Sequence, residues 1–198
     1  MYSPIKAFVI VHGKSEFQMC NYCKMVNRLK IEVIGDKNGE KSITIHNILS
    51  FLNKDKFCSE TNFKSYWEDV WLDDNLKHLN KGLKIFIIMD KDDCTEEEFT
   101  QFVNKDMFKK HWAYKYIIPI YNNKNLEEIL TKAGIKYTKK SWRGKKTEYV
   151  NIFPTTTRDI NHQKGADIEE VRDKLKKVNN TNMEEIFSYC LDNKVVHK

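Results

Sequence analysis

The stretch Leu83-Lys84-Ile85-Phe86-Ile87-Ile88-Met89-Asp90-Lys91-Asp92-Asp93-Cys94 decides the fold, because an apolar run ends abruptly in it at three aspartates. A short run of β-branched and aromatic residues bounded by polar ones is typical of a central strand buried on both faces. Ligands of open α/β sheets collect at the carboxyl ends of such strands. The aspartates therefore mark the edge of the sheet where a binding site is expected.

The three aspartates Asp90, Asp92 and Asp93 favour a divalent cation. Carboxylates this close together repel one another unless a positive group lies between them, and their oxygens suit magnesium, calcium or manganese. The alternative is a simple helix start, since Thr95 to Glu98 has the pattern of a capping box whose acids complement the helix dipole. That alternative explains the glutamates after Thr95 but explains Asp90 and Asp92, on the strand side, poorly.

The rest of the chain alternates between strand and helix patterns. Strands are predicted at residues 5–12, 30–34, 83–90 and 116–121, and helices at 16–29, 42–52, 61–79, 96–110 and 125–133. Beyond Gly134 the pattern is less regular, with a short strand at 149–153 and helices at 167–177 and 183–192. Such alternation predicts an α/β domain with a mainly parallel sheet flanked by helices over residues 1–135. Residues 136–198 then form a basic segment and a C-terminal helical extension packed on the same domain.

Composition limits the class of protein. No apolar run approaches the roughly 20 residues that a membrane span needs, the first residues lead straight into a strand, and we expect a cytoplasmic protein without a membrane partner. Five cysteines without regular spacing fit reduced thiols. Cys20 and Cys23 leave zinc or redox use open, but at helical spacing they are expected to fill an apolar helix face.

The net charge of +6 is unevenly distributed. Residues 136–147 contain six basic residues and no acid, which favours contact with phosphate groups. A tryptophan in this stretch is a candidate for stacking on a base. The predicted nucleic-acid contacts of this stretch are Lys139, Lys140, Trp142, Arg143, Lys145 and Lys146.

Two strand ends carry a pattern that resembles the TOPRIM domain. The TOPRIM signature is a hydrophobic strand ending in Glu-Gly-x-x-Glu or Glu-Gly-x-x-Asp, followed later by a hydrophobic strand ending in Asp-x-Asp. Here His12-Gly13-Lys14-Ser15-Glu16 follows the first strand, and Asp90-Lys91-Asp92 ends the later one. A third element, residues 118–128, resembles the corresponding strand and helix start of small bacterial TOPRIM proteins of the RloB and overcoming-lysogenization-defect (OLD) type. The resemblance covers about residues 5 to 135.

The resemblance implies a TOPRIM-like Rossmannoid fold and a nuclease that uses Mg²⁺ or Mn²⁺ to hydrolyse DNA or RNA, in bacterial defence against phage. Carboxylate-held cations and neighbouring lysines neutralise charge on the reacting phosphate in this chemistry. The implied catalytic residues are His12, Glu16, Asp90, Lys91 and Asp92, and the implied metal ligands are Glu16, Asp90, Asp92 and Asp93. Lys14 is a further candidate for contact with phosphate, and Glu127 and Glu128 are possible additional site residues.

One departure from the family pattern leaves the activity open. His12 stands where the family has its first glutamate, and a histidine can bind a metal or shuttle protons. The same substitution also fits a non-catalytic nucleic-acid-binding or regulatory module. The family context implies an ATPase partner, which would be another chain because this sequence has no Gly-x-x-x-x-Gly-Lys-Ser/Thr loop; a homodimer is also compatible.

A third interpretation takes Asp90 and Asp92 as the nucleophile and acid of a haloacid-dehalogenase-like phosphatase. Those enzymes usually carry the motif near the N-terminus, with Thr or Val two places after the second aspartate. Here that place is Cys94, and the motif lies deep in the chain.

Overall fold

The computed structural model describes residues 4–92, 94–135, 152–155 and 165–195. Within this part, four strands form one sheet in the order β2-β1-β3-β4, and every pair is parallel. The strands are β1 (Ala7–Val11), β2 (Ile31–Ile34), β3 (Lys84–Asp90) and β4 (Ile117–Asn122). Each lies within a residue or two of its predicted position, and the α/β class is confirmed.

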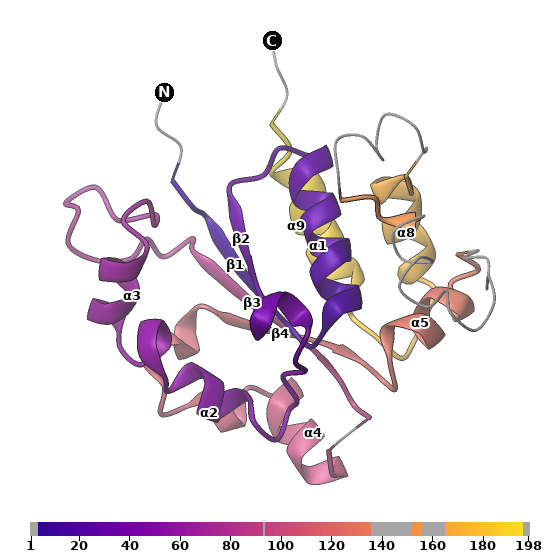
Figure 1. The fold of residues 1–198 in the computed structure, drawn as a ribbon, viewed down its shortest axis with the longest axis horizontal. Coiled ribbons are helices and arrows are strands. Elements are labelled where there is room, and N and C mark those ends of the chain that lie inside the picture. The colour runs from indigo at the N-terminus through magenta and orange to yellow at the C-terminus, as the bar shows by residue number, and fades with distance from the viewer. Residues whose placement is uncertain (1–3, 93, 136–151, 156–164, 196–198) are drawn as a thin grey trace.

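Helices cover both faces of the sheet (Figure 1). One face carries α1 (Lys14–Val26), α5 (Leu126–Lys132), α8 (Ile168–Leu175) and α9 (Glu184–Asp192). The other face carries α2 (Ile48–Leu52), α3 (Glu60–Tyr66), α4 (Glu96–Val103) and the short 3-10 turns η2 (Asp55–Phe57), η3 (Asp106–Phe108) and η4 (Trp112–Lys115). A further turn, η1 (Lys37–Gly39), follows β2.

The central strands are apolar throughout because both of their faces are buried. All five residues of β1 are buried, and in β3 only Lys84 is not. Their side chains alternate between two hydrophobic clusters: Val9 and Phe86 pack on the α1 and α9 side, whereas Phe8 and Ile87 pack on the α3 and α4 side. This two-sided burial is what the continuous apolar runs predict.

Helix α1 places a narrow face on the sheet. Its buried residues Met19, Cys20, Tyr22 and Cys23 recur at helical spacing. Cys20 and Cys23 therefore fill an apolar face, as predicted, and Cys190 of α9 is buried beside them.

Two predicted helices are wrong in extent. Residues 61–79 form a helix only as far as Tyr66, after which the chain runs in a loop that forms isolated bridges from Val70 to Ile5 and from Leu72 to Leu79. In 42–52 the helix begins only at Ile48, with Asn47 in the N-cap position. Within residues 61–79, Phe63 and Trp67 are buried, and a residue buried in a loop gives the same apolar sequence pattern as one buried in a helix.

Two other predictions were too long or of the wrong kind. The helix predicted at 96–110 ends at Val103 and continues as the 3-10 turn η3. Within the predicted strand at 149–153, only Ile152 and Phe153 belong to the described residues, and neither is in a strand. Phe153 is fully buried and contacts the ring of Tyr22.

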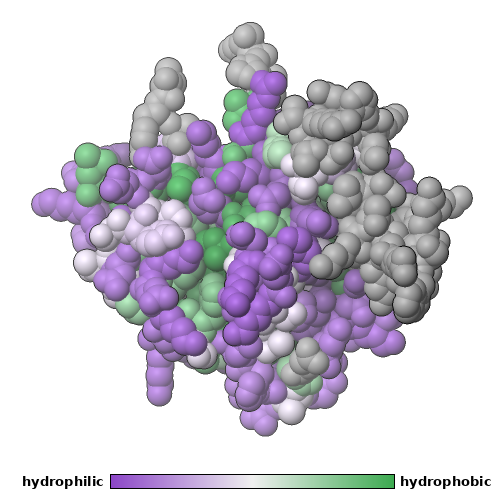
Figure 2. Space-filling view, viewed as in Figure 1, coloured by the Kyte–Doolittle hydropathy of each residue, from purple (hydrophilic) through white to green (hydrophobic). Residues whose placement is uncertain are grey.

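The surface shown in Figure 2 is mostly hydrophilic, with a band of hydrophobic residues between the two helical layers, where β2 forms an edge of the sheet. Exposed large apolar residues in the described part are spread over different elements, and single exposures of this kind are ordinary; they are Val26, Tyr66, Leu76, Tyr114 and Val195. Among the described helices, none has the length and apolar composition needed to cross a bilayer.

Candidate active site

The parallel register brings the predicted site residues to one edge of the sheet. His12 follows the last residue of β1, Asp90 ends β3, and Asn122 ends β4 directly opposite Asp90. Val11 is paired with Ile88, two residues before Asp90. The carboxyl ends of three strands therefore meet in a line, and the N-terminus of α1 lies next to them because it follows β1 after a two-residue turn.

Glu16 is a buried carboxylate on the first turn of α1, with only 2% of its surface exposed. Its Oε2 accepts a hydrogen bond from the backbone N–H of Gly13 at 3.1 Å, which holds the side chain against the strand end. Burial, together with the nearby charges of Glu127 and Asp92, raises the pKa of Glu16 to about 7, although hydrogen bonds from the backbone act in the opposite direction.

A close backbone contact fixes the turn that carries Glu16. Gly39 has a φ of +82°, and a Cβ atom there would lie 2.8 Å from the carbonyl oxygen of Gly13. Only glycine allows η1 to approach the start of α1 this closely. The loop after β2 therefore helps to define the position of Gly13 and, through it, of Glu16.

Asp90 is the second buried carboxylate, with 6% of its surface exposed. Burial raises its pKa to about 8, with the negative charge of Glu16 as the next cause; the hydrogen bond from Asn122 and the charge of His12 act in the opposite direction. Glu16 and Asp90 thus come from different elements and interact as like charges within the protein interior.

Two further acids add to this negative charge. Asp92, which is exposed, raises the pKa of both Glu16 and Asp90, and Glu127, at the start of α5, raises that of Glu16. Glu128 differs, because it forms ion pairs with Lys124 at 3.3 Å and Lys132 at 2.7 Å that lower its pKa. Of the two glutamates that sequence spacing could not separate, Glu127 is therefore the one that interacts with the site.

His12 has a defined ring orientation. Its Nδ1 lies 2.8 Å from the carbonyl oxygen of Ile43, which can only accept, so Nδ1 carries a proton and Nε2 is the acceptor when the ring is neutral. The backbone N–H of Ile43 donates in turn to the carbonyl oxygen of His12 at 2.8 Å. Hydrogen bonds with Ile43 thus fix both the ring and the backbone of His12.

The basic residues predicted to contact phosphate have less support from the structure than the acids do. The ammonium group of Lys91 pairs with Glu96 at 2.7 Å and lies over the ring of Phe99, so it already has an anionic partner. Lys14 is the partly buried first residue of α1. Asp93 and the predicted nucleic-acid contacts Lys139, Lys140, Trp142, Arg143, Lys145 and Lys146 lie outside the described residues.

The acids fit a divalent cation in chemistry but do not yet surround one. Carboxylate oxygens are the ligands that magnesium and manganese prefer. In the described ranges, however, no three His, Cys, Asp or Glu side chains are arranged so that they could hold a metal ion. Glu16 and Asp90 supply two buried carboxylates that interact with each other, so a closed site requires a third ligand to move toward them.

Sequence reasoning missed two residues of this edge. Asn122 is fully buried and donates from Nδ2 to Asp90 Oδ1 at 2.9 Å, and the Thr181 hydroxyl lies 2.9 Å from Asn122 Oδ1. A polar residue at the end of an apolar strand was the available signal for Asn122. Nothing in the sequence around Thr181 indicates that it reaches a strand end 59 residues earlier.

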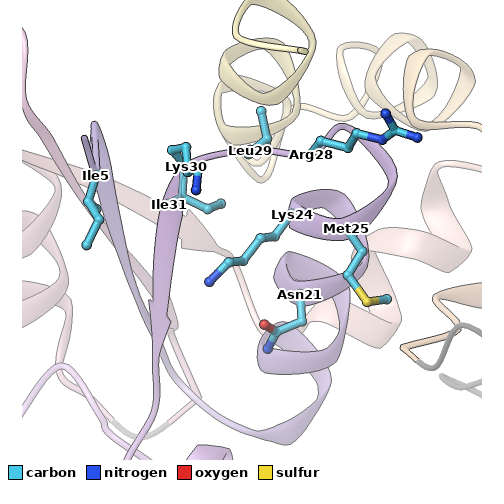
Figure 3. A pocket seen from close by; sticks show the side chains of 8 residues that line it. All are labelled: Ile5, Asn21, Lys24, Met25, Arg28, Leu29, Lys30 and Ile31. Carbon is cyan, nitrogen blue, oxygen red and sulfur yellow. The ribbon is translucent and has the colours of Figure 1, made fainter. Parts of the chain in front are cut away.

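A hollow among the described residues lies away from the candidate site. It measures about 520 Å³ and lies where α1 ends and β2 begins (Figure 3), near the amino ends of the strands. Lys24, Arg28 and Lys30 line it, but Figure 3 shows Lys24 and Arg28 extending in different directions, and Lys24 pairs with Glu32 at 3.4 Å. These cations do not converge on one point, so the hollow adds nothing to the candidate site.

Comparisons with protein-family models, with curated proteins and with solved structures each found no match for this chain. The resemblance to TOPRIM domains therefore rests on the residues at the two strand ends, and it stays a prediction.

Proposed function

We propose that the protein is a divalent-metal-dependent nuclease whose site is built around Glu16 and Asp90. One observation carries the proposal: the carboxylates of Glu16 and Asp90 come from different elements, are both buried and interact as like charges, with more acids near them, while the positive charge of His12 acts on Asp90 in the opposite direction. Burying like charges together is costly in free energy unless a cation binds between them. Sites that perturb pKa values in this way are often functional.

The proposed roles follow from position. A bound Mg²⁺ or Mn²⁺ ion would neutralise negative charge on a phosphodiester and on its leaving oxygen. Glu16 and Asp90 would hold the ion, with Asp92 as the third ligand after a side-chain rotation. His12, with Nε2 as an acceptor, would take a proton from the attacking water, and Lys14 would contact a phosphate oxygen.

The nucleic-acid partner, DNA or RNA, is proposed from the basic stretch at residues 136–147. With this substrate we also propose a cytoplasmic location. An ATPase partner and a role in defence against phage stay predictions of the TOPRIM resemblance.

The first test is metal binding followed by cleavage. Purified protein freed of metal is titrated with Mn²⁺ by calorimetry and then incubated with Mg²⁺ or Mn²⁺ and single-stranded DNA, double-stranded DNA and RNA. We expect binding and cleavage by the natural protein, and at least a tenfold loss of both in Glu16→Gln and Asp90→Asn. Glu128→Gln is the matched control, because Glu128 is paired on the surface and should leave both unchanged.

A non-catalytic nucleic-acid-binding module is the second candidate. It is favoured by His12 at the motif glutamate position and by the absence of a three-ligand group within the described residues. Binding of DNA or RNA that is unaffected by Asp90→Asn, with no cleavage under any metal, would support this candidate and contradict the nuclease.

A further inference from the structure

The segment at residues 180–183, which precedes α9, runs along the outer edge of β4. The N–H of Asn123 donates to the carbonyl oxygen of Asn180 at 2.8 Å, and the side chain of Asn182 accepts from the N–H of Tyr121 at 2.8 Å and donates to the carbonyl oxygen of Pro119 at 3.0 Å. Asn122 and Thr181 form an isolated antiparallel bridge. The C-terminal part of the chain thus covers the edge of β4 with specific bonds and ends beside the candidate site.

Within this segment, Thr181 makes contacts that reach the site. Its hydroxyl accepts a hydrogen bond from the N–H of Met183 at 3.0 Å and has two acceptors within reach, the carbonyl oxygen of Tyr121 at 2.8 Å and Oδ1 of Asn122 at 2.9 Å. Thr181 and Asn122 are both buried, with 7% and 0% exposed. When the hydroxyl donates to Oδ1, that end of the Asn122 amide faces Thr181 and the NH₂ group faces Asp90.

We propose that Thr181 and Asn122 are positioning residues for Asp90. The Asn122 NH₂ group donates to Oδ1 of Asp90, and this bond would hold the carboxylate in one orientation toward a ligand. The C-terminal segment thereby becomes part of the site, although it is distant in sequence from every motif residue.

A packing role alone would not require these side chains. A fully buried amide costs free energy unless its donors and acceptors are bonded, and an apolar residue of similar size would fill the space without that cost. The bonds of Asn122 run to one site carboxylate and to one residue of the C-terminal segment. Partners of this kind, which hold a ligating carboxylate in place, typically change metal affinity by about 10–100-fold when removed.

The first arm of the test needs no metal. Side-chain amide signals of Asn122 are identified by NMR from their disappearance in Asn122→Leu, and their hydrogen exchange is measured in the metal-free protein. We expect slow exchange in the natural protein and in Thr181→Ser, and at least tenfold faster exchange in Thr181→Val, which keeps the shape but lacks the hydroxyl. Thr100→Val is the control, because it removes a hydroxyl that bonds the Glu96 carbonyl on α4, in a different layer of the fold.

The second arm measures Mn²⁺ affinity in the same proteins and rests on the proposed function. We expect about tenfold weaker binding in Thr181→Val and in Asn122→Leu, and unchanged binding in Thr181→Ser and Thr100→Val. Slow exchange that depends on Thr181, together with no Mn²⁺ binding by the natural protein, would keep the positioning of Asp90 and reject the metal site.

Two other outcomes would contradict the positioning role of Thr181. If Thr181→Val leaves both the Asn122 exchange and the Mn²⁺ affinity as they are, the positioning role is wrong while the metal site stands. If Thr181→Val does not fold, the test is the exchange rate of the Asn122 side-chain amide in the natural protein. Fast exchange there would overturn the proposal.

Discussion

Glu16 and Asp90 make the stability of the metal-free protein depend on pH. Burial raises their pKa values to about 7 and about 8, from 4.5 and 3.8, and the charge of Glu16 adds to the rise at Asp90. The unfolded chain therefore loses these protons at lower pH than the folded protein does, so the free energy of unfolding falls as the pH rises from about 4 to about 8. We expect a difference on the order of a few kcal/mol in urea unfolding between pH 5 and pH 8 with a chelator present.

Asp90→Asn supplies the control for this prediction. The amide keeps the shape and can still accept from Asn122, but it removes the titrating group whose pKa the charge of Glu16 helps to raise. The variant should lose much of the pH slope and should be more stable than the natural protein at pH 8. Equal slopes in the two proteins would show that the buried pair does not control the stability.

Glu127 and Glu128 are adjacent and of one type, yet only one interacts with the site. Glu127→Gln should weaken Mn²⁺ binding several-fold, since it removes a charge that acts on Glu16. Glu128→Gln loses two surface ion pairs, which are worth roughly 0–1 kcal/mol, and should leave Mn²⁺ binding unchanged. Calorimetric titration of the two variants is the measurement, and an equal effect of both would remove Glu127 from the site.

At the level of elements, η1 supports the start of α1 through Gly39. Gly39 and Gly134 both have positive φ, of +82° and +65°, but only Gly39 has backbone atoms in the space that a Cβ would take. Gly134→Ala should cost about 1 kcal/mol from backbone strain alone. Gly39→Ala should cost at least twice as much by urea unfolding, because the backbone at Gly13 must also move. A similar loss in the free energy of unfolding for the two variants would mean that the contact between η1 and α1 can adjust at little energetic cost.

The elements that sequence patterns predicted well are those with a local cause. β1 and β3 are apolar because both faces are buried, and α4 begins at Thr95, whose capping box with Glu98 is present. The segment after Tyr66 was predicted wrongly because Trp67 and Val70 are buried by packing against β1, a distant contact that fixes burial without fixing helical geometry. Tertiary contacts decide such segments, and local pattern does not reveal them.

The residues of the candidate site were likewise predictable from the sequence only in part. Asp90 ends the apolar strand β3 and Glu16 lies on the first turn of the helix that follows β1, so the parallel pairing of β1 with β3 brings them to one edge of the sheet. Asn122 could have been suspected from the end of β4, but Thr181 reaches it through the path of the C-terminal segment, which no local pattern encodes. The role of the basic stretch at residues 136–147 is still a prediction, since it lies outside the described residues.

At the scale of the whole molecule, the two hydrophobic clusters share one sheet and should unfold together. Side chains of β1 and β3 belong to both clusters, so neither layer of helices can leave without exposing strands that the other layer covers. The C-terminal helices contribute Leu175, Met183 and Phe187 to the cluster on the α1 side. We therefore expect α8 and α9 to be required for folding of the residues that precede them.

Phe187→Ala tests this coupling, because its effect can be observed from the opposite face. Phe187 is fully buried in α9, and its loss should cost about 3–5 kcal/mol. Trp67, Trp71 and Trp112 all lie in or against the cluster on the other face, so fluorescence in a Trp142→Phe background reports unfolding of that face. Cooperative unfolding requires the fluorescence midpoint in urea to shift as far as the midpoint from circular dichroism. A fluorescence midpoint that stays in place while the circular dichroism midpoint falls would mean that the two layers unfold independently.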